Sequence, residues 1–161
     1  MNKKEMEVSR TQAWNYFEYH ATQRLTTFNF YLTLSSLISS ALFFSLNSAN
    51  LFWISIFLGF LLIIFSFIFQ KLDRRNRDLI NGAEEALKYF EKETRLPKDG
   101  NLPHITKIFL REEILTKKKK GEKSWFFWKN YLTYSDSFSV IYFGFGIIGG
   151  AGVVLSLVKL I

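Results

Sequence analysis

Two pairs of adjacent acidic residues are the nearest approach to an acid–base site in this sequence. Glu84-Glu85 and Glu112-Glu113 are neighbours in the chain, and on a helix such neighbours point about 100° apart. Neither pair therefore forms a carboxylate dyad, and we interpret both as solvated surface. The sequence also lacks a Cys nucleophile, a phosphate-binding Gly loop and a nucleophile elbow. We predict that the protein is not an enzyme.

Metal-binding residue types are scarce. The sequence contains no Cys, and its two histidines are His20 and His104. Zinc and most transition-metal sites in proteins are built from several Cys and His side chains. We therefore expect no metal and no cofactor.

A basic run followed by aromatic residues is the strongest candidate for ligand binding. Lysines beside tryptophans, just outside an apolar span, are typical of contact with anionic lipid headgroups. An anionic nucleotide ligand and a solvated loop are the alternative interpretations. The residues predicted to bind lipid or another anionic ligand are Lys117, Lys118, Lys119, Lys120, Lys123, Trp125 and Trp128.

Three long apolar segments account for the position of the basic residues. Residues 28–46, 51–69 and 137–158 contain no charged side chain, and each is close to the roughly 20 residues that cross a hydrocarbon core of about 30 Å. A soluble chain of this length has too little polar sequence to cover three such helices. The predicted fold class is an all-α integral membrane protein with three transmembrane helices. We expect no direct nucleic-acid binding despite a net charge of +7, because the positive charge lies beside the spans.

The predicted organisation has four parts. These are a cytoplasmic or interfacial helix at 1–27, a transmembrane hairpin at 28–70, a basic cytoplasmic helical region at 71–130 and a C-terminal transmembrane helix at 131–161. The second span should continue as one long cytoplasmic helix to about Glu93. Its apolar residues beyond the span recur at helical spacing and should share one face: Leu72, Leu79, Ala83, Ala86 and Phe90.

The distribution of Lys and Arg predicts the orientation. Of the 21 Lys and Arg residues, most lie within 71–129, none lies in the hairpin loop at 47–50, and only Lys159 follows the third span. Positive charge marks the cytoplasmic side of a membrane protein. We expect a bacterial inner-membrane protein with a cytoplasmic N-terminus and an outward C-terminus.

Small residues on the third span predict close helix packing. Gly146 and Gly150 form a GxxxG pair, and Gly149 and Ser156 extend the same strip. The strip can pack within one subunit or between subunits. We predict a homo-oligomer in which Gly146, Gly149, Gly150 and Ser156 form the contact.

The first span is rich in hydroxyl side chains, namely Thr33, Ser35, Ser36, Ser39, Ser40 and Ser45. They could line a water-filled path once several subunits assemble. Ser and Thr hydroxyls also bond to their own helix at little cost, which is the alternative interpretation.

Aromatic side chains precede the first span and suit the membrane interface. Three polar residues follow them. His20, Gln23 and Arg24 are the candidates for contact with another subunit or with a ligand.

Three groups of residues together resemble a family of small, mostly uncharacterised bacterial membrane proteins. They are Ala13-Trp14-Asn15-Tyr16-Phe17 with His20-Ala21-Thr22-Gln23-Arg24, Lys71-Leu72-Asp73-Arg74-Arg75 with Ala83-Glu84-Glu85-Ala86-Leu87, and Tyr134-Ser135-Asp136-Ser137-Phe138. The family shares an N-terminal transmembrane hairpin, a charged cytoplasmic helix and a C-terminal span. In architecture it looks like the membrane effectors of antiphage defence systems, and the resemblance implies no established activity.

The sequence leads to one functional hypothesis and two rivals. The first is a signal-responsive, membrane-perturbing effector, with membrane lipids and a cytoplasmic protein or nucleotide signal as its partners. The rivals are a passive anchor or scaffold that recruits a cytoplasmic partner, and a small constitutive channel.

Overall fold

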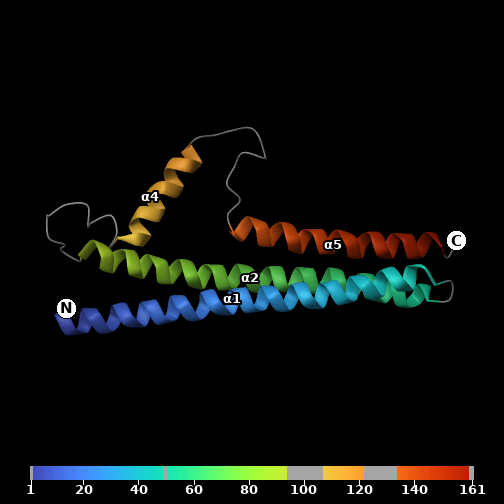
Figure 1. Cartoon of the computed structure of the whole chain (residues 1–161), viewed down its shortest axis with the longest axis horizontal. Helices are drawn as coiled ribbons and strands as arrows, with labels where there is room; N and C mark the ends of the chain where they lie inside the picture. The colour runs from blue at the N-terminus through green and yellow to red at the C-terminus, as the bar shows by residue number, and fades with distance from the viewer. Residues whose placement is uncertain (1, 49–50, 94–106, 122–133, 160–161) are drawn as a thin grey trace. The chain divides into compact units, whose positions relative to one another are not determined.

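The computed structural model describes residues 2–48, 51–93, 107–121 and 134–159. These residues form four helices (Figure 1): α1 (Lys3–Leu46), α2 (Phe52–Glu93), α4 (Ile108–Gly121) and α5 (Tyr134–Val158). Three of them are long and apolar enough to cross a membrane. The predicted all-α fold class is confirmed, as is the extension of the second spanning helix to Glu93.

Helix α1 is unbroken over 44 residues. Its sequence contains neither Gly nor Pro, the two residues that most disfavour a helix interior. The helix ends beside Asn47 and Ser48, whose backbone N–H groups donate to the carbonyls of Phe44 and Ser45 at 3.2 Å each. Bonds to the third preceding residue tighten the last turn of a helix, and here they lead into the loop before α2.

The chain divides into two compact units. Unit 1 contains Met1–Thr22 and Asp78–Tyr131, and unit 2 contains Gln23–Arg77 and Leu132–Ile161. Helices α1 and α2 each contribute to both units, and α5 belongs to unit 2. Unit 2 holds the apolar segments of all three spanning helices.

Unit 2 turns large apolar side chains outward. Phe44, Phe57, Phe67 and Phe143 are each more than half exposed, as suits helices that contact lipid on their outer faces. The core of unit 2 is aromatic at one end, where Phe28 of α1 stacks on Phe138 of α5 with ring centroids 3.7 Å apart.

The buried face of α2 beyond the span differs from the predicted one. Ala83 and Phe90 are buried as expected, but Leu72 is 42% exposed, whereas Ile80 and Leu87 are buried. Helical spacing allows both sets, because several overlapping faces of this segment carry apolar residues. The neighbouring helices decide which of those faces is covered.

Candidate functional site

A buried ion pair joins α1 and α2 at one end of unit 2. The Nε of Arg24 donates to Oδ1 of Asp73 at 2.7 Å, and its Nη2 donates to Oδ2 at 3.1 Å. The two side chains are 13% and 7% exposed. This two-pronged contact between a guanidinium and a carboxylate is the strongest form of salt bridge and fixes the geometry of both partners.

The third spanning helix joins the same contact through Ser135. The hydroxyl of Ser135 accepts one bond from Nη2 of Arg24 at 3.2 Å and another from Nη1 of Arg77 at 2.6 Å. The guanidinium of Arg24 also lies over the ring of Phe138, 5.0 Å from its centroid. We call Arg24, Asp73, Arg77 and Ser135 the boundary cluster, because Arg24, Asp73 and Ser135 lie within about one turn of an uncharged segment and Arg77 lies one turn further along α2.

The boundary cluster sets the register of the three spans. Removing one partner of a buried ion pair leaves an uncompensated charge and costs about 3–5 kcal/mol. A helix that slid along its axis by one turn would separate Arg24 from Asp73 and leave both charges without a partner. The cluster therefore penalises sliding more strongly than apolar contacts do.

The interior of unit 2 is lined with hydroxyl groups. Among its most deeply buried side chains are Tyr31, Ser35, Ser55, Tyr142 and Ser156. We call these five residues, with Ser45 and Ser66, the hydroxyl core.

Several members of the hydroxyl core bond to one another between helices. Tyr31 and Ser66 lie 2.9 Å apart through their hydroxyl oxygens. Because Ser66 donates its own proton to the carbonyl of Leu62 at 2.8 Å, Tyr31 is the donor. Closer to the hairpin loop, Ser55 donates to Ser45 at 2.7 Å. Such bonds between spans hold α1 against α2 where no water competes.

Two hydroxyls on α1 lack partners. The Oγ atoms of Ser35 and Ser39 are buried and form no hydrogen bond within the described residues. Buried polar atoms in folded proteins are nearly always paired. These two therefore mark a place where the packing of unit 2 leaves polar groups unsatisfied.

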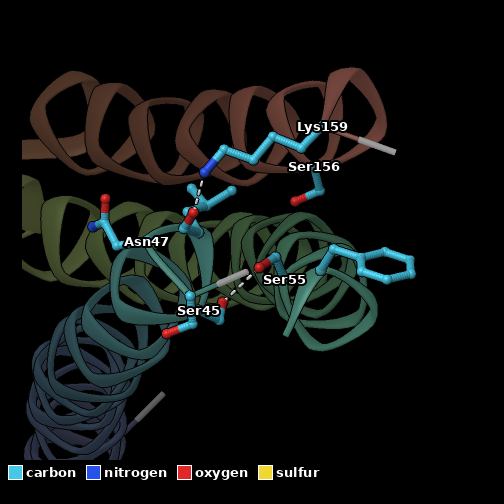
Figure 2. A pocket seen from close by; sticks show the side chains of 8 residues that line it. Ser45, Asn47, Ser55, Ser156 and Lys159 are labelled. Carbon is cyan, nitrogen blue, oxygen red and sulfur yellow. Dashed lines mark hydrogen bonds between the residues drawn. The ribbon is translucent and has the colours of Figure 1, made fainter. Parts of the chain in front are cut away.

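The opposite end of unit 2 contains a cavity of about 330 Å³. Figure 2 shows Lys159 reaching from the end of α5, where its Nζ donates to the backbone carbonyl of Leu46 at the end of α1. Ser45, Ser55 and Ser156 line the same cavity. A cation at the carboxyl end of a helix satisfies an otherwise unpaired carbonyl and complements the helix dipole.

Glycines let α5 approach its neighbours closely. A Cβ added to Gly149 would lie 2.7 Å from the carbonyl oxygen of Gly59, and a Cβ on Gly59 would lie 2.8 Å from that of Gly149. A Cβ on Gly152 would lie 2.7 Å from a methyl group of Leu42. The crossing of α2 and α5 thus depends on glycine at both positions.

Unit 1 has its own set of polar contacts. The carboxylate of Glu91 on α2 accepts the backbone N–H groups of Phe109 and Leu110, at 3.2 and 3.0 Å. N–H groups in the first turn of a helix such as α4 have no partner within the helix itself, and the helix dipole favours a carboxylate at this end. The ring of Phe109 packs edge-on against Trp14 and Phe17 of α1, with centroids 6.3 and 5.5 Å apart.

The two acidic pairs are less solvated than predicted. Glu84 and Glu113 are each about one-third exposed and lie on either side of Lys88, at 4.0 and 3.6 Å from its Nζ. Burial raises the pKa of Glu84; Lys88 opposes this shift, and the nearby Glu112 adds to it. The prediction of solvated surface therefore fits the exposed Glu85 and Glu112, whereas Glu84 and Glu113 are partly covered and lie near Lys88.

Comparison with known proteins places the whole bundle in a family. The model of the octameric membrane protein family (8xMP) matches residues 9–158, which include all three spans. The chain belongs to this family. It is therefore a multi-pass membrane protein of an octameric family, and the predicted homo-oligomer is confirmed at that level.

A relative of this octameric-family chain is CD-NTase-associated protein 19 from Escherichia coli. It is 39% identical over 79 residues, which cover 48% of this chain and 52% of the relative. The chain thus matches about half the length of that relative. No solved structure matches the chain. The resemblance inferred from the sequence, to bacterial membrane proteins that look like antiphage effectors, is confirmed by these two matches.

The predicted anion-binding residues lie largely outside the described structure. Lys117 to Lys120 belong to α4, but the structure does not describe their side chains. Lys123, Trp125 and Trp128 lie outside the described residues. Contact of these seven residues with lipid or another anion therefore stays a prediction.

The predicted packing strip of α5 is divided by the structure. Gly149 and Ser156 face the inside of unit 2. A Cβ on Gly146 would make ordinary contact with Ser66 at 3.7 Å, whereas a Cβ on Gly150 would meet nothing within 4 Å. Gly150 thus faces open space within the subunit, and the role of the strip between subunits stays a prediction.

The polar residues before the first span have different surroundings. Arg24 is engaged within its own subunit by the boundary cluster. His20 lies among the rings of Tyr16 and Tyr19, with centroids 4.3 and 5.2 Å away, and Gln23 is exposed. Their contact with other subunits or ligands stays a prediction.

Asp73 and Gly59 are among the residues to which the sequence analysis assigned no role in the site. Asp73 is an acidic residue in a strongly basic stretch, one turn beyond a span, which is an unusual position. Gly59 is a lone glycine in an otherwise bulky apolar run. The unusual position of Asp73 and the isolation of Gly59 are both visible in the sequence, but neither feature indicates which residue on another helix is the partner.

Proposed function

We propose that this chain is one subunit of an octameric bacterial inner-membrane effector. It would respond to a cytoplasmic signal by perturbing the membrane, without catalysing a reaction, as part of antiphage defence. Membership of the octameric membrane protein family and the relationship to a CD-NTase-associated protein support this proposal. The signal would be a protein or a nucleotide.

The observation that carries the proposal is the continuity of α1 and α2. Each helix passes without a break from unit 1 into the spans of unit 2. A conformational change in either helix of unit 1 would therefore reach the spans through one continuous helix. The boundary cluster connects both helices to α5, so a movement of one span would displace the other two as well.

An assay of membrane potential in bacteria tests this proposal. Cells that express the protein should depolarise and arrest growth when phage infection supplies the signal, and much less without infection. A chain with a Pro in place of Leu62 serves as the control, since it breaks a span and should abolish the effect. A passive scaffold would assemble in the membrane and leave the potential unchanged under every condition. A constitutive channel would depolarise cells equally with and without infection.

A further inference from the structure

One outward face of α1 is polar along most of its membrane-spanning length. Its residues recur at steps of three and four, with one step of seven, which keeps them in line on a helix. All of them are exposed on unit 2. We call them the polar seam: Thr26, Asn29, Thr33, Ser36 and Ser40 on α1, and Asn47 in the turn directly after it.

The neighbouring outward face of α1 has the opposite character. Phe30, Leu37 and Phe44 recur every seven residues and are 59%, 64% and 70% exposed. These side chains suit lipid. The polar seam lies beside them at the same depth, so the exposed surface of α1 changes from apolar to polar around the helix.

Lipid is a poor environment for the polar seam. Thr33 and Ser40 donate their hydroxyls to carbonyls one turn back, at 3.0 and 2.9 Å, which lowers their cost in an apolar medium. Asn29 carries a carboxamide on this exposed face, and that group needs partners for its two donors and its acceptor. An unpaired amide in hydrocarbon costs several kcal/mol, so this face should contact water or another polar surface.

An octamer offers water to such a face. Neighbouring packed helices have axes about 8–10 Å apart. Eight of them in a ring place each axis about 10–13 Å from the centre, and a helix with its side chains has a radius of about 5–6 Å. With side chains of average size, a central space about 4–8 Å in radius therefore remains, and larger side chains narrow it.

We propose that the polar seam of α1 faces the axis of the octamer and lines a water-filled path, which is gated by Phe43. This inference rests on the proposed function, because the path exists only in an assembly. Phe43 occupies the seam position between Ser40 and Asn47 and is 71% exposed. Eight such rings would narrow the path at one level, and an apolar constriction stops ions by excluding water.

Cysteine accessibility tests the direction of the seam. The chain contains no Cys, so a single introduced thiol is the only target for a charged, membrane-impermeant thiosulfonate. In assembled protein in liposomes, Ser36→Cys should react at least an order of magnitude faster than Leu37→Cys, its exposed neighbour at the same depth. Equal and slow reaction of both would overturn the inference, since it would place the seam in lipid or in a dry helix contact.

A second pair of variants tests the gate. Phe43→Ser should increase the ion flux through liposomes that contain the assembled protein, because it removes the apolar ring. Phe44→Ser is the matched control, since Phe44 is equally exposed on the apolar face, and it should leave the flux unchanged. Equal effects of both variants would overturn the role of Phe43.

The two proposals can fail separately. Fast reaction of Ser36→Cys in a protein that never depolarises cells would preserve the seam and reject the effector. Depolarisation by a protein in which Ser36→Cys and Leu37→Cys react alike would support the effector and reject the seam.

Discussion

Arg24 and Asp73 are separated by 49 residues of sequence, yet they form two hydrogen bonds at the edge of the membrane-spanning bundle. Their charges lie one turn outside the uncharged segments of α1 and α2. The pair therefore requires the span of α1 to begin at the same membrane depth at which the span of α2 ends. It also provides a sensitive point at which the stability of the bundle can be measured.

Replacing Asp73 should destabilise the subunit strongly. Asp73→Ala leaves the buried guanidinium of Arg24 without its counterion, so we expect a loss of about 3–5 kcal/mol in the free energy of unfolding. Thermal unfolding in mild detergent measures the change. Asp78→Ala is the matched control, because Asp78 is an exposed Asp on the same helix and should cost less than about 0.5 kcal/mol. Similar losses from both variants would contradict the role of the pair.

Two adjacent glycines of α5 should respond differently to a larger side chain. Gly149→Leu forces the backbones of α2 and α5 apart at Gly59 and should prevent stable folding of the subunit. The side chain introduced by Gly150→Leu would extend into open space within the subunit, so this variant should fold. If Gly150 packs against a neighbouring copy, Gly150→Leu should lower the assembly size, as measured by light scattering in mild detergent. An unchanged octamer in the Gly150 variant would show that Gly150 does not contact a neighbouring copy.

The raised pKa of Glu84 predicts a pH dependence of the stability of unit 1. A carboxyl whose pKa is raised on folding favours the folded state most at pH values below its ordinary pKa of 4.5, and this contribution is lost as pH rises through the folded pKa. Glu84→Gln should therefore raise the thermal stability near pH 7 and flatten the profile above pH 4.5. Glu85→Gln, at an exposed neighbour, should change neither. A lower stability of Glu84→Gln at pH 7 would show that the contact with Lys88 outweighs burial.

Changing Lys117, Lys118, Lys119 and Lys120 together to Gln should reduce the binding of anionic lipid. Each basic residue near a charged membrane surface contributes about 1 kcal/mol, and added salt weakens the attraction. Native mass spectrometry of full-length protein from mixed phosphatidylglycerol and phosphatidylcholine nanodiscs counts the retained lipids. Retention equal to that of the unmodified protein at low salt would favour a solvated segment.

The two ends of the chain should lie on opposite sides of the membrane. Three spans and the distribution of Lys and Arg predict a cytoplasmic Asn2 and an outward Ile161. An alkaline phosphatase fusion, which is active only outside the cytoplasm, should be active at Ile161 and inactive at Asn2. Activity at Asn2, or its absence at Ile161, would contradict this orientation.

Much of the fold follows from the sequence because it depends on local properties. An uncharged run such as 137–158 is long enough to cross a bilayer whatever its neighbours are. The hydrogen bonds of a helix join residues four apart, so the long course of α2 to Glu93 was also predictable. The membrane therefore constrains the number and length of the spans before any two helices meet.

Only the tertiary structure decided how the faces of those helices are used. The hydroxyls of α1 have similar chemistry in the sequence, yet Ser35 and Ser45 lie inside the bundle whereas Ser36 and Ser40 lie outside it. Gly149 and Gly150 are adjacent, and one permits a helix crossing while the other is open. The physical reason is that side chains one residue apart point about 100° away from each other. Their roles are therefore set by where the neighbouring helices pack, and long-range contacts such as that between Arg24 and Asp73 determine this packing.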